Sequence, residues 1–176
     1  MIDKISMQLS VVLKRKFPNG LPELETINYV HKFFISNVIP IVLILLIALS
    51  TGSLASVALS LFGFAFLRLF SGGLHLKSVA ACAILSAVVV FIIPLLGEIM
   101  NSYTHLLIII TAIIVSIYAP SNIRKQTRIP EKYFIHLKII SILIVVSNLL
   151  IESSVLAVAY LVQAVTLIRL KGGEKK

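Results

Sequence analysis

The sequence predicts an all-α, polytopic membrane protein with about six transmembrane helices, and three observations lead to this prediction. The 176 residues are 59% hydrophobic, 13% charged and have a mean hydropathy of +1.05, which is typical of membrane proteins. The apolar residues form long runs that come in pairs. The net charge of +9 comes from basic residues between these runs, where membrane topology explains them better than nucleic-acid binding does.

Residues 1–32 are predicted to form a cytoplasmic, interfacial segment. They contain no apolar run long enough for the core of a signal peptide, so we expect the N-terminus to stay in the cytoplasm. Apolar residues recur there at helical spacing beside a basic cluster at 14–16, which is the pattern of an amphipathic helix on an anionic leaflet. These apolar residues are Ile5, Leu9, Val12 and Leu13. The turn at 18–20 should end this helix, and a short segment at 22–31 should lead into the first span.

Residues 33–170 are predicted to form the membrane domain. The expected spans are 33–50, 53–70, 79–96, 106–118, 139–151 and 155–168. Several are shorter than the ~20 residues of a usual spanning helix, so we expect them to extend into the flanking loops. Small and polar residues at 51–53 and 152–154 indicate tight turns within two helical hairpins.

The distribution of charge predicts the orientation of this domain. All 16 Lys and Arg residues fall before the first span, at 68–78, at 119–138 or after residue 168. The only charged residues in the turns on the opposite side are Glu98 and Glu152. By the positive-inside rule the basic side is cytoplasmic, and both termini, including a basic tail at 171–176, lie there.

Polar chemistry is concentrated between the second and third spans. Cys82 is the only cysteine of the chain, and His75 precedes it by seven residues. A thiol with a nearby imidazole is a candidate nucleophile and base, because the thiolate is the reactive form. The alternative is that Cys82 is a small buried apolar residue and His75 a solvated side chain at the membrane edge.

If His75 and Cys82 act together, their spacing requires a bend in the chain. In a straight helix the two residues would share a face but lie roughly 10 Å apart along the axis. Gly72 and Gly73 can adopt backbone angles closed to other residues, and Ser78 is a suitable N-cap for a helix that starts after it. Cys82 would then lie in the first turns of that helix, where the helix dipole favours the thiolate.

The surrounding residues offer supporting roles. We expect Arg68 and His75 to line a cavity, because polar groups at membrane depth rarely face lipid. The Gly72 and Gly73 amides are either oxyanion donors or simply part of the turn. Ser86 is expected to be a helix-packing residue.

No acidic residue lies between Glu25 and Glu98, so a local Cys-His-Asp triad is excluded. A group that orients His75 must be a Ser, an Asn or a backbone carbonyl, or an acid from another cytoplasmic segment, such as Glu23, Glu25 or Glu131. One cysteine also excludes an internal disulfide and any CxxC site. We expect no metal and no other cofactor.

The core pattern Arg68-x3-Gly72-Gly73-x-His75-x6-Cys82-x3-Ser86, in a small basic membrane protein, resembles the accessory gene regulator B (AgrB) family of quorum-sensing membrane peptidases. The resemblance covers nearly the whole chain. It implies that His75 and Cys82 are the catalytic pair. From the residues themselves, we expect Arg68, Gly72, Gly73 and Ser78 to support the site or to position the substrate.

The resemblance also implies an activity and partners. The protein would cleave the C-terminal part of a short precursor peptide through a Cys82 thioester, and would promote cyclisation to a thiolactone or lactone autoinducing peptide. The precursor would have an amphipathic leader and an acidic tail, which the basic segments 119–138 and 169–176 would attract. The expected setting is the cell membrane, with the active site at its cytoplasmic face. A homodimer is a further expectation, and no nucleic acid is expected to bind.

Two other functions fit the same sequence. Six short helices with glycine-containing interruptions are compatible with a peptide transporter or exporter, although the spans carry no acidic residue to couple ions. A basic membrane scaffold that binds anionic lipids is the other alternative. Replacing Cys82 by Ser distinguishes them, because only the enzyme needs the thiol.

The partition of basic residues makes a testable prediction about topology. In a Cys82→Ser background, single cysteines at Gly52, Ser102 and Ser153 should react with an impermeant maleimide added to intact cells. A cysteine at Gln126 should react only after the membrane is opened. Labelling of the Gln126 variant from outside would contradict the orientation.

Overall fold

The computed structural model describes residues 2–74, 79–121 and 130–168, and this part of the chain is helical without a β-strand. The all-α prediction is therefore confirmed. The predicted tail at 171–176 lies outside the described residues. The helices are α1 (Ile2–Lys16), α2 (Leu24–Ser50), α3 (Leu54–Ser71), α4 (Val79–Ile99), α5 (Thr104–Tyr118), α6 (Phe134–Ile151) and α7 (Ser154–Val165), with short 3-10 helices η1 (Asn101–Tyr103) and η3 (Glu131–Tyr133).

Five helical stretches are long and apolar enough to cross a membrane. They contain α2 to α6 and correspond to the first five predicted spans. The sixth, α7, has only 12 residues. At 1.5 Å per residue it is about 18 Å long, well below the ~30 Å thickness of a hydrocarbon core. The count of six spans therefore remains a prediction.

The outer surface of this bundle is apolar. Large aliphatic side chains on several helices point away from the protein, including Leu150, which is 90% exposed, and Ile99, which is 77% exposed. Exposed apolar surface on this scale is unfavourable in water and suits contact with lipid. The surface thus agrees with a multi-pass membrane protein.

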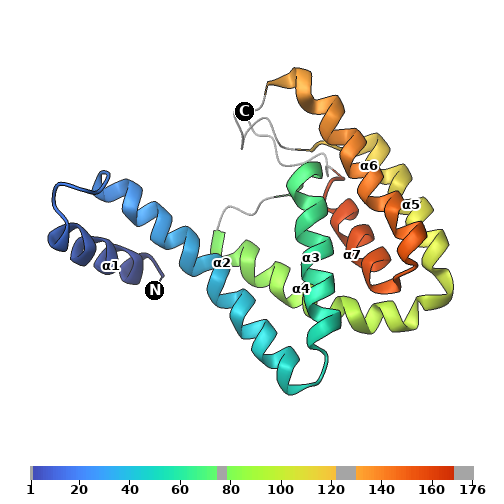
Figure 1. The fold of residues 1–176 in the computed structure, drawn as a ribbon, viewed down its shortest axis with the longest axis horizontal. Helices are drawn as coiled ribbons and strands as arrows, with labels where there is room; N and C mark the ends of the chain where they lie inside the picture. Colours follow the sequence, from blue (N-terminus) through green and yellow to red (C-terminus); the bar gives the residue numbers. More distant parts are fainter. Residues whose placement is uncertain (1, 75–78, 122–129, 169–176) are drawn as a thin grey trace.

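The first span is longer than the sequence indicated. Residues 22–31 were expected to form a separate short segment, but α2 runs without interruption from Leu24 to Ser50. No helix-breaking residue lies between Pro22 and Pro40, and a proline is tolerated inside a membrane helix. Figure 1 shows that the N-terminal part of α2, together with α1, projects from the other helices as an arm.

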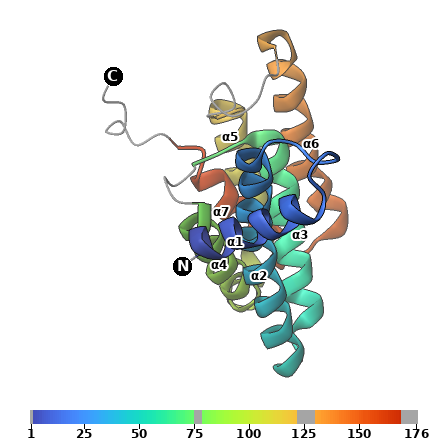
Figure 2. The same cartoon turned by 90° about the vertical axis from the view of Figure 1, so that its left-hand side faces the viewer.

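The helix α1 packs against α2 through polar contacts. Ser10 Oγ lies 2.8 Å from His31 Nδ1, and Asp3 forms an ion pair with Lys32. The hydrogen bond and charge of Lys32 hold the pKa of the Asp3 carboxyl below its ordinary value. The predicted apolar side of α1 stays uncovered, since Leu9 is 47% and Val12 is 63% exposed. The interfacial position of α1 remains a prediction, and Figure 2 shows α1 in front of the bundle.

The short helix α7 lies at the centre of the bundle, in contact with α3, α4 and α5 (Figure 1). Two glycines let neighbouring helices approach it closely. A Cβ at Gly63 of α3 would come within 2.7 Å of Leu156 Cδ2, and one at Gly97 of α4 within 3.1 Å of the Val155 backbone. The buried residues of α7 are Leu156, Ala157, Val158, Ala159, Tyr160, Gln163 and Ala164.

The connections predicted to lie outside include the two tight turns, and both are present. Gly52 and Glu152 have φ values of 71° and 55°, which places each in the left-handed region. Glu152 Oε1 lies 3.8 Å from His105 Nε2, so the turn between α6 and α7 and the start of α5 lie at the same end of the bundle. The orientation predicted from charge also requires these connections to share one side.

The close approach at Gly97 makes a prediction about stability. Gly97→Val should destabilise the protein by about 1–3 kcal/mol, because the new side chain meets the backbone of α7, which cannot move aside cheaply. Thermal unfolding in detergent micelles measures the effect. Gly20→Val is the control, since a Cβ at Gly20 meets nothing within 4 Å. Equal melting temperatures for the two variants would contradict tight packing of α4 on α7.

Candidate active site at the ends of three helices

The chain breaks between α3 and α4, as the spacing of His75 and Cys82 required. The helix α3 ends at Ser71, and Gly72 and Gly73 follow with φ values of 73° and 139°. The helix that carries Cys82 begins at Val79. The prediction of a glycine turn with positive φ is therefore confirmed, and the described part of α4 agrees with a new helix after His75. His75 and Ser78 themselves lie outside the described residues.

Main-chain hydrogen bonds join the ends of α3, α5 and α7 around this turn. Gly73 N donates to Ser121 O at 3.1 Å, and Ser121 N donates to Ser71 O at 2.9 Å. Leu74 N donates to Thr166 O at 3.0 Å, just after the end of α7. Segments predicted to be cytoplasmic therefore meet at one end of the bundle.

The main-chain amides of both glycines already have hydrogen-bond acceptors, one in α3 and one just after α5. Gly72 N donates to Arg68 O at 2.9 Å, and Gly73 N donates to Ser121 O. A backbone N–H that already has a good acceptor is a poor oxyanion donor. Of the two roles that the sequence left open for Gly72 and Gly73, the structure favours formation of the turn over oxyanion binding.

Arg68 connects this turn to the thiol. Its Nη2 atom donates to Leu74 O at 2.6 Å and lies 3.9 Å from Cys82 Sγ. Its guanidinium also lies 5.8 Å from the centre of the Phe64 ring. Unit charges about 4 Å apart attract by about 1 kcal/mol in water and by several times more in a lower dielectric. Arg68 is thus placed to stabilise negative charge on Cys82.

The other side of Arg68 meets an amide that the sequence analysis missed. Arg68 Nη1 donates to Gln163 Oε1 at 3.3 Å, and Gln163 Nε2 donates to Gly72 O at 2.7 Å and to Ser71 Oγ at 3.3 Å. Gln163 is fully buried. The sequence did contain a signal for this residue. Gln163 is the only amide side chain in the apolar run 155–168, and polar residues inside membrane helices are usually functional.

A cavity of about 90 Å³ adjoins Cys82. It is much smaller than the several hundred Å³ of a typical ligand pocket, so it has room for one side chain and not for a peptide. Its polar lining residues are Arg68, Cys82, Ser86 and Thr166. Its apolar lining residues are Phe64, Leu74, Leu85, Val89 and Val162. None of these described residues is acidic, so Glu23, Glu25 and Glu131 do not line the cavity.

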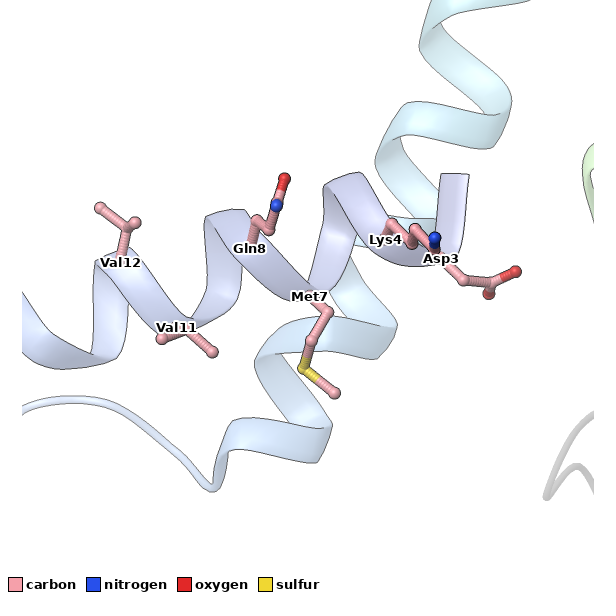
Figure 3. A pocket seen from close by; sticks show the side chains of 6 residues that line it. All are labelled: Asp3, Lys4, Met7, Gln8, Val11 and Val12. Carbon is pink, nitrogen blue, oxygen red and sulfur yellow. The ribbon is translucent and has the colours of Figure 1, made fainter. Parts of the chain in front are cut away.

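A second hollow, of about 850 Å³, lies on α1. Figure 3 shows its lining side chains, which all come from that helix and include Met7, Val11 and Val12. It shares no residue with the cavity beside Cys82. Although this hollow is larger, it contains none of the candidate catalytic residues, so we do not assign the site to it. Within the described ranges, moreover, no three His, Cys, Asp or Glu side chains are grouped so as to hold a metal ion.

Comparison with known proteins gave one family. The family model described as Accessory gene regulator B (AgrB) matches residues 3–170 of this chain. Searches of curated proteins and of solved structures gave no match. The matched region contains every residue of the site described above.

The glycine turn makes a prediction about the stability of the site. Gly73→Ala should cost more than about 2 kcal/mol, because its Cβ would combine an unfavourable φ with a 2.7 Å approach to Thr166 Oγ1. Gly52→Ala is the matched control, since Gly52 also has positive φ but has open space around it. Thermal unfolding of both variants in detergent checks this. A Gly52→Ala variant as unstable as Gly73→Ala would show that the contacts at Gly73 do not matter.

Proposed function

Because the chain belongs to the AgrB family, we propose that it is a membrane cysteine endopeptidase that processes a precursor of an autoinducing peptide for quorum sensing. It would cleave off the C-terminal part of the precursor and promote cyclisation of the remainder. The observation that carries the proposal is the position of Cys82, beside the Arg68 guanidinium and in a cavity next to a broken helix.

Cys82 has the surroundings of a reactive thiol. It lies in the first turn of α4, where the positive end of the helix dipole favours an anion. It is half-buried and lines the small cavity, through which a substrate group would reach it. A cation and a helix N-terminus are the usual means by which proteins activate a cysteine.

We assign the first chemical step to His75 and Cys82. The Cys82 thiolate attacks the carbonyl carbon of the scissile peptide bond, and His75 in its protonated form gives a proton to the leaving nitrogen. The C–N bond breaks, the C-terminal fragment leaves as a free amine, and the rest of the precursor stays bound as a thioester on Cys82. No oxidant, reductant or metal is needed.

The second step closes the ring. An internal cysteine or serine of the precursor gives its proton to neutral His75 and attacks the thioester carbonyl. Cys82 leaves as a thiolate, and the product is a thiolactone or a lactone. Both catalytic groups return to their starting protonation states. The attack competes with hydrolysis, so exclusion of water from this small and mostly apolar cavity while the substrate is bound would favour cyclisation.

The surroundings of the site suit a membrane-bound substrate. The cavity accepts one side chain next to the scissile carbonyl, while the peptide itself would lie along the cytoplasmic edge of the bilayer. An acidic C-terminal tail would be attracted by the basic segments 119–138 and 169–176, which include Lys132 and Lys138. The amphipathic leader would lie in the same membrane interface as α1.

The proposal predicts how variants of the two catalytic residues behave. Cys82→Ser should abolish precursor cleavage, and His75→Ala should slow it by about 10²- to 10⁴-fold, the usual range for loss of a general acid–base group. The assay co-expresses the full-length protein with a candidate precursor that has an amphipathic leader, an internal Cys or Ser and an acidic tail. The precursor carries a tag at its C-terminus, and the assay follows release of the tag.

Ser116→Ala is the matched control, because Ser116 lies on α5, where its hydroxyl bonds Ala112 O of the same helix, and does not line the cavity. All variants should insert into the membrane at wild-type levels. Mass spectrometry of the His75→Ala protein should also detect slower alkylation of Cys82 at neutral pH. Undiminished cleavage by Cys82→Ser would refute the enzyme and favour a transporter or a scaffold.

A further inference from the structure

The side-chain amide of Gln163 links three elements of the candidate site. It accepts a hydrogen bond from Arg68 on α3 and donates to Ser71 Oγ and to Gly72 O in the turn, while its own helix, α7, lies at the centre of the bundle. Gln163 is fully buried. Burying a primary amide is costly unless its hydrogen bonds are satisfied, and here both amide atoms have partners.

The chemistry of these partners determines which way the amide points. A guanidinium can only donate, so it must face the Gln163 oxygen, and the Gly72 carbonyl can only accept, so it must face the nitrogen. Neither a carboxylate nor a hydrocarbon side chain of the same length could make both contacts. The position therefore favours glutamine over residues of similar size.

The contact with Gln163 restricts Arg68. Gln163 Oε1 accepts from Nη1, and Leu74 O accepts from Nη2, so two acceptors hold two nitrogens of one planar guanidinium. With the plane fixed in this way, Nη2 is the nitrogen left facing Cys82 Sγ, at 3.9 Å. Without Gln163, the long and flexible arginine side chain would have one fewer anchor and could leave the thiol for solvent.

We propose that Gln163 is a positioning residue, which holds the Arg68 guanidinium beside the Cys82 thiol and so keeps the nucleophile reactive. This inference rests on the proposed role of Cys82 as nucleophile. Gln163 does not touch the sulfur or the substrate, and it acts only through Arg68. The prediction that follows is that its effect on the thiol disappears when Arg68 is absent.

The experiment measures the reactivity of Cys82 in the full-length protein in detergent micelles. Iodoacetamide is the probe, and because Cys82 is the only cysteine, the rate of alkylation at pH 7 reports on one sulfur. Gln163→Met, which keeps the length but removes the amide, should react about tenfold more slowly than the wild type, as expected for loss of a hydrogen bond to a charged group. Arg68→Met should react at least as slowly.

The double variant separates positioning from general damage. In the Arg68→Met background, Gln163→Met should change the alkylation rate by less than about twofold, because the proposed route through Arg68 has been removed. Asn148→Leu is the matched control for loss of a buried amide. Asn148 is equally buried and bonds the main chain of Ser153, at the other end of α7. It should leave the rate unchanged.

Three results would overturn the proposal. The first is an alkylation rate in Gln163→Met equal to that of the wild type. The second is a tenfold slowing by Gln163→Met that persists in the Arg68→Met background. The third is a similar slowing of alkylation in Asn148→Leu. If Gln163→Met does not fold, Gln163→Asn takes its place in the same cycle, since the shorter side chain keeps an uncharged amide but withdraws it from Arg68. The alkylation assay uses no peptide, so it tests the role of Gln163 even if the protein cleaves no precursor. If the protein does cleave a precursor but Gln163→Met slows alkylation equally with and without Arg68, only the role of Gln163 is refuted.

Discussion

The main-chain hydrogen bonds between the ends of α3, α5 and α7 are the constraint on which the rest of the site depends. A helix that ends inside an apolar bundle exposes N–H and C=O groups that lipid cannot satisfy. Here the ends satisfy one another, through the pairs Gly73–Ser121, Ser121–Ser71 and Leu74–Thr166. The chain can therefore leave helical geometry next to Cys82 without leaving these polar groups unpaired.

The short helix α7 makes this arrangement possible. Its small and buried residues let α3, α4 and α5 pack around it, and its early end at Val165 brings Thr166 to the level of the glycine turn. If α7 had full spanning length, Thr166 would still be inside the helix, and its carbonyl would not be free to accept from Leu74 N. Because α7 is enclosed by protein, its length need not match the thickness of the bilayer.

Much of the site could be predicted from the sequence because its signals are local. Contact between His75 and Cys82 is impossible along a straight helix, so a catalytic pair predicted a break at the glycines between the spans. Gly72 and Gly73 form this break with positive φ. The role of Arg68 at the thiol was only partly foreseen, since a position near a cavity does not specify partners. Gln163 and Thr166 were not found, because both lie more than 80 residues from Cys82 in sequence.

The sequence by itself determined the all-α class, the position of five apolar helices, the tight turns and the break before Cys82, because hydropathy, glycine and charge act through neighbouring residues. Only the tertiary structure decided that α2 is continuous with the preceding segment, that α7 is the central helix, and that Gln163 meets Arg68. The physical reason is that packing depends on which buried faces and unsatisfied polar groups meet in space. The spacing of residues along the chain does not predict such contacts between distant segments.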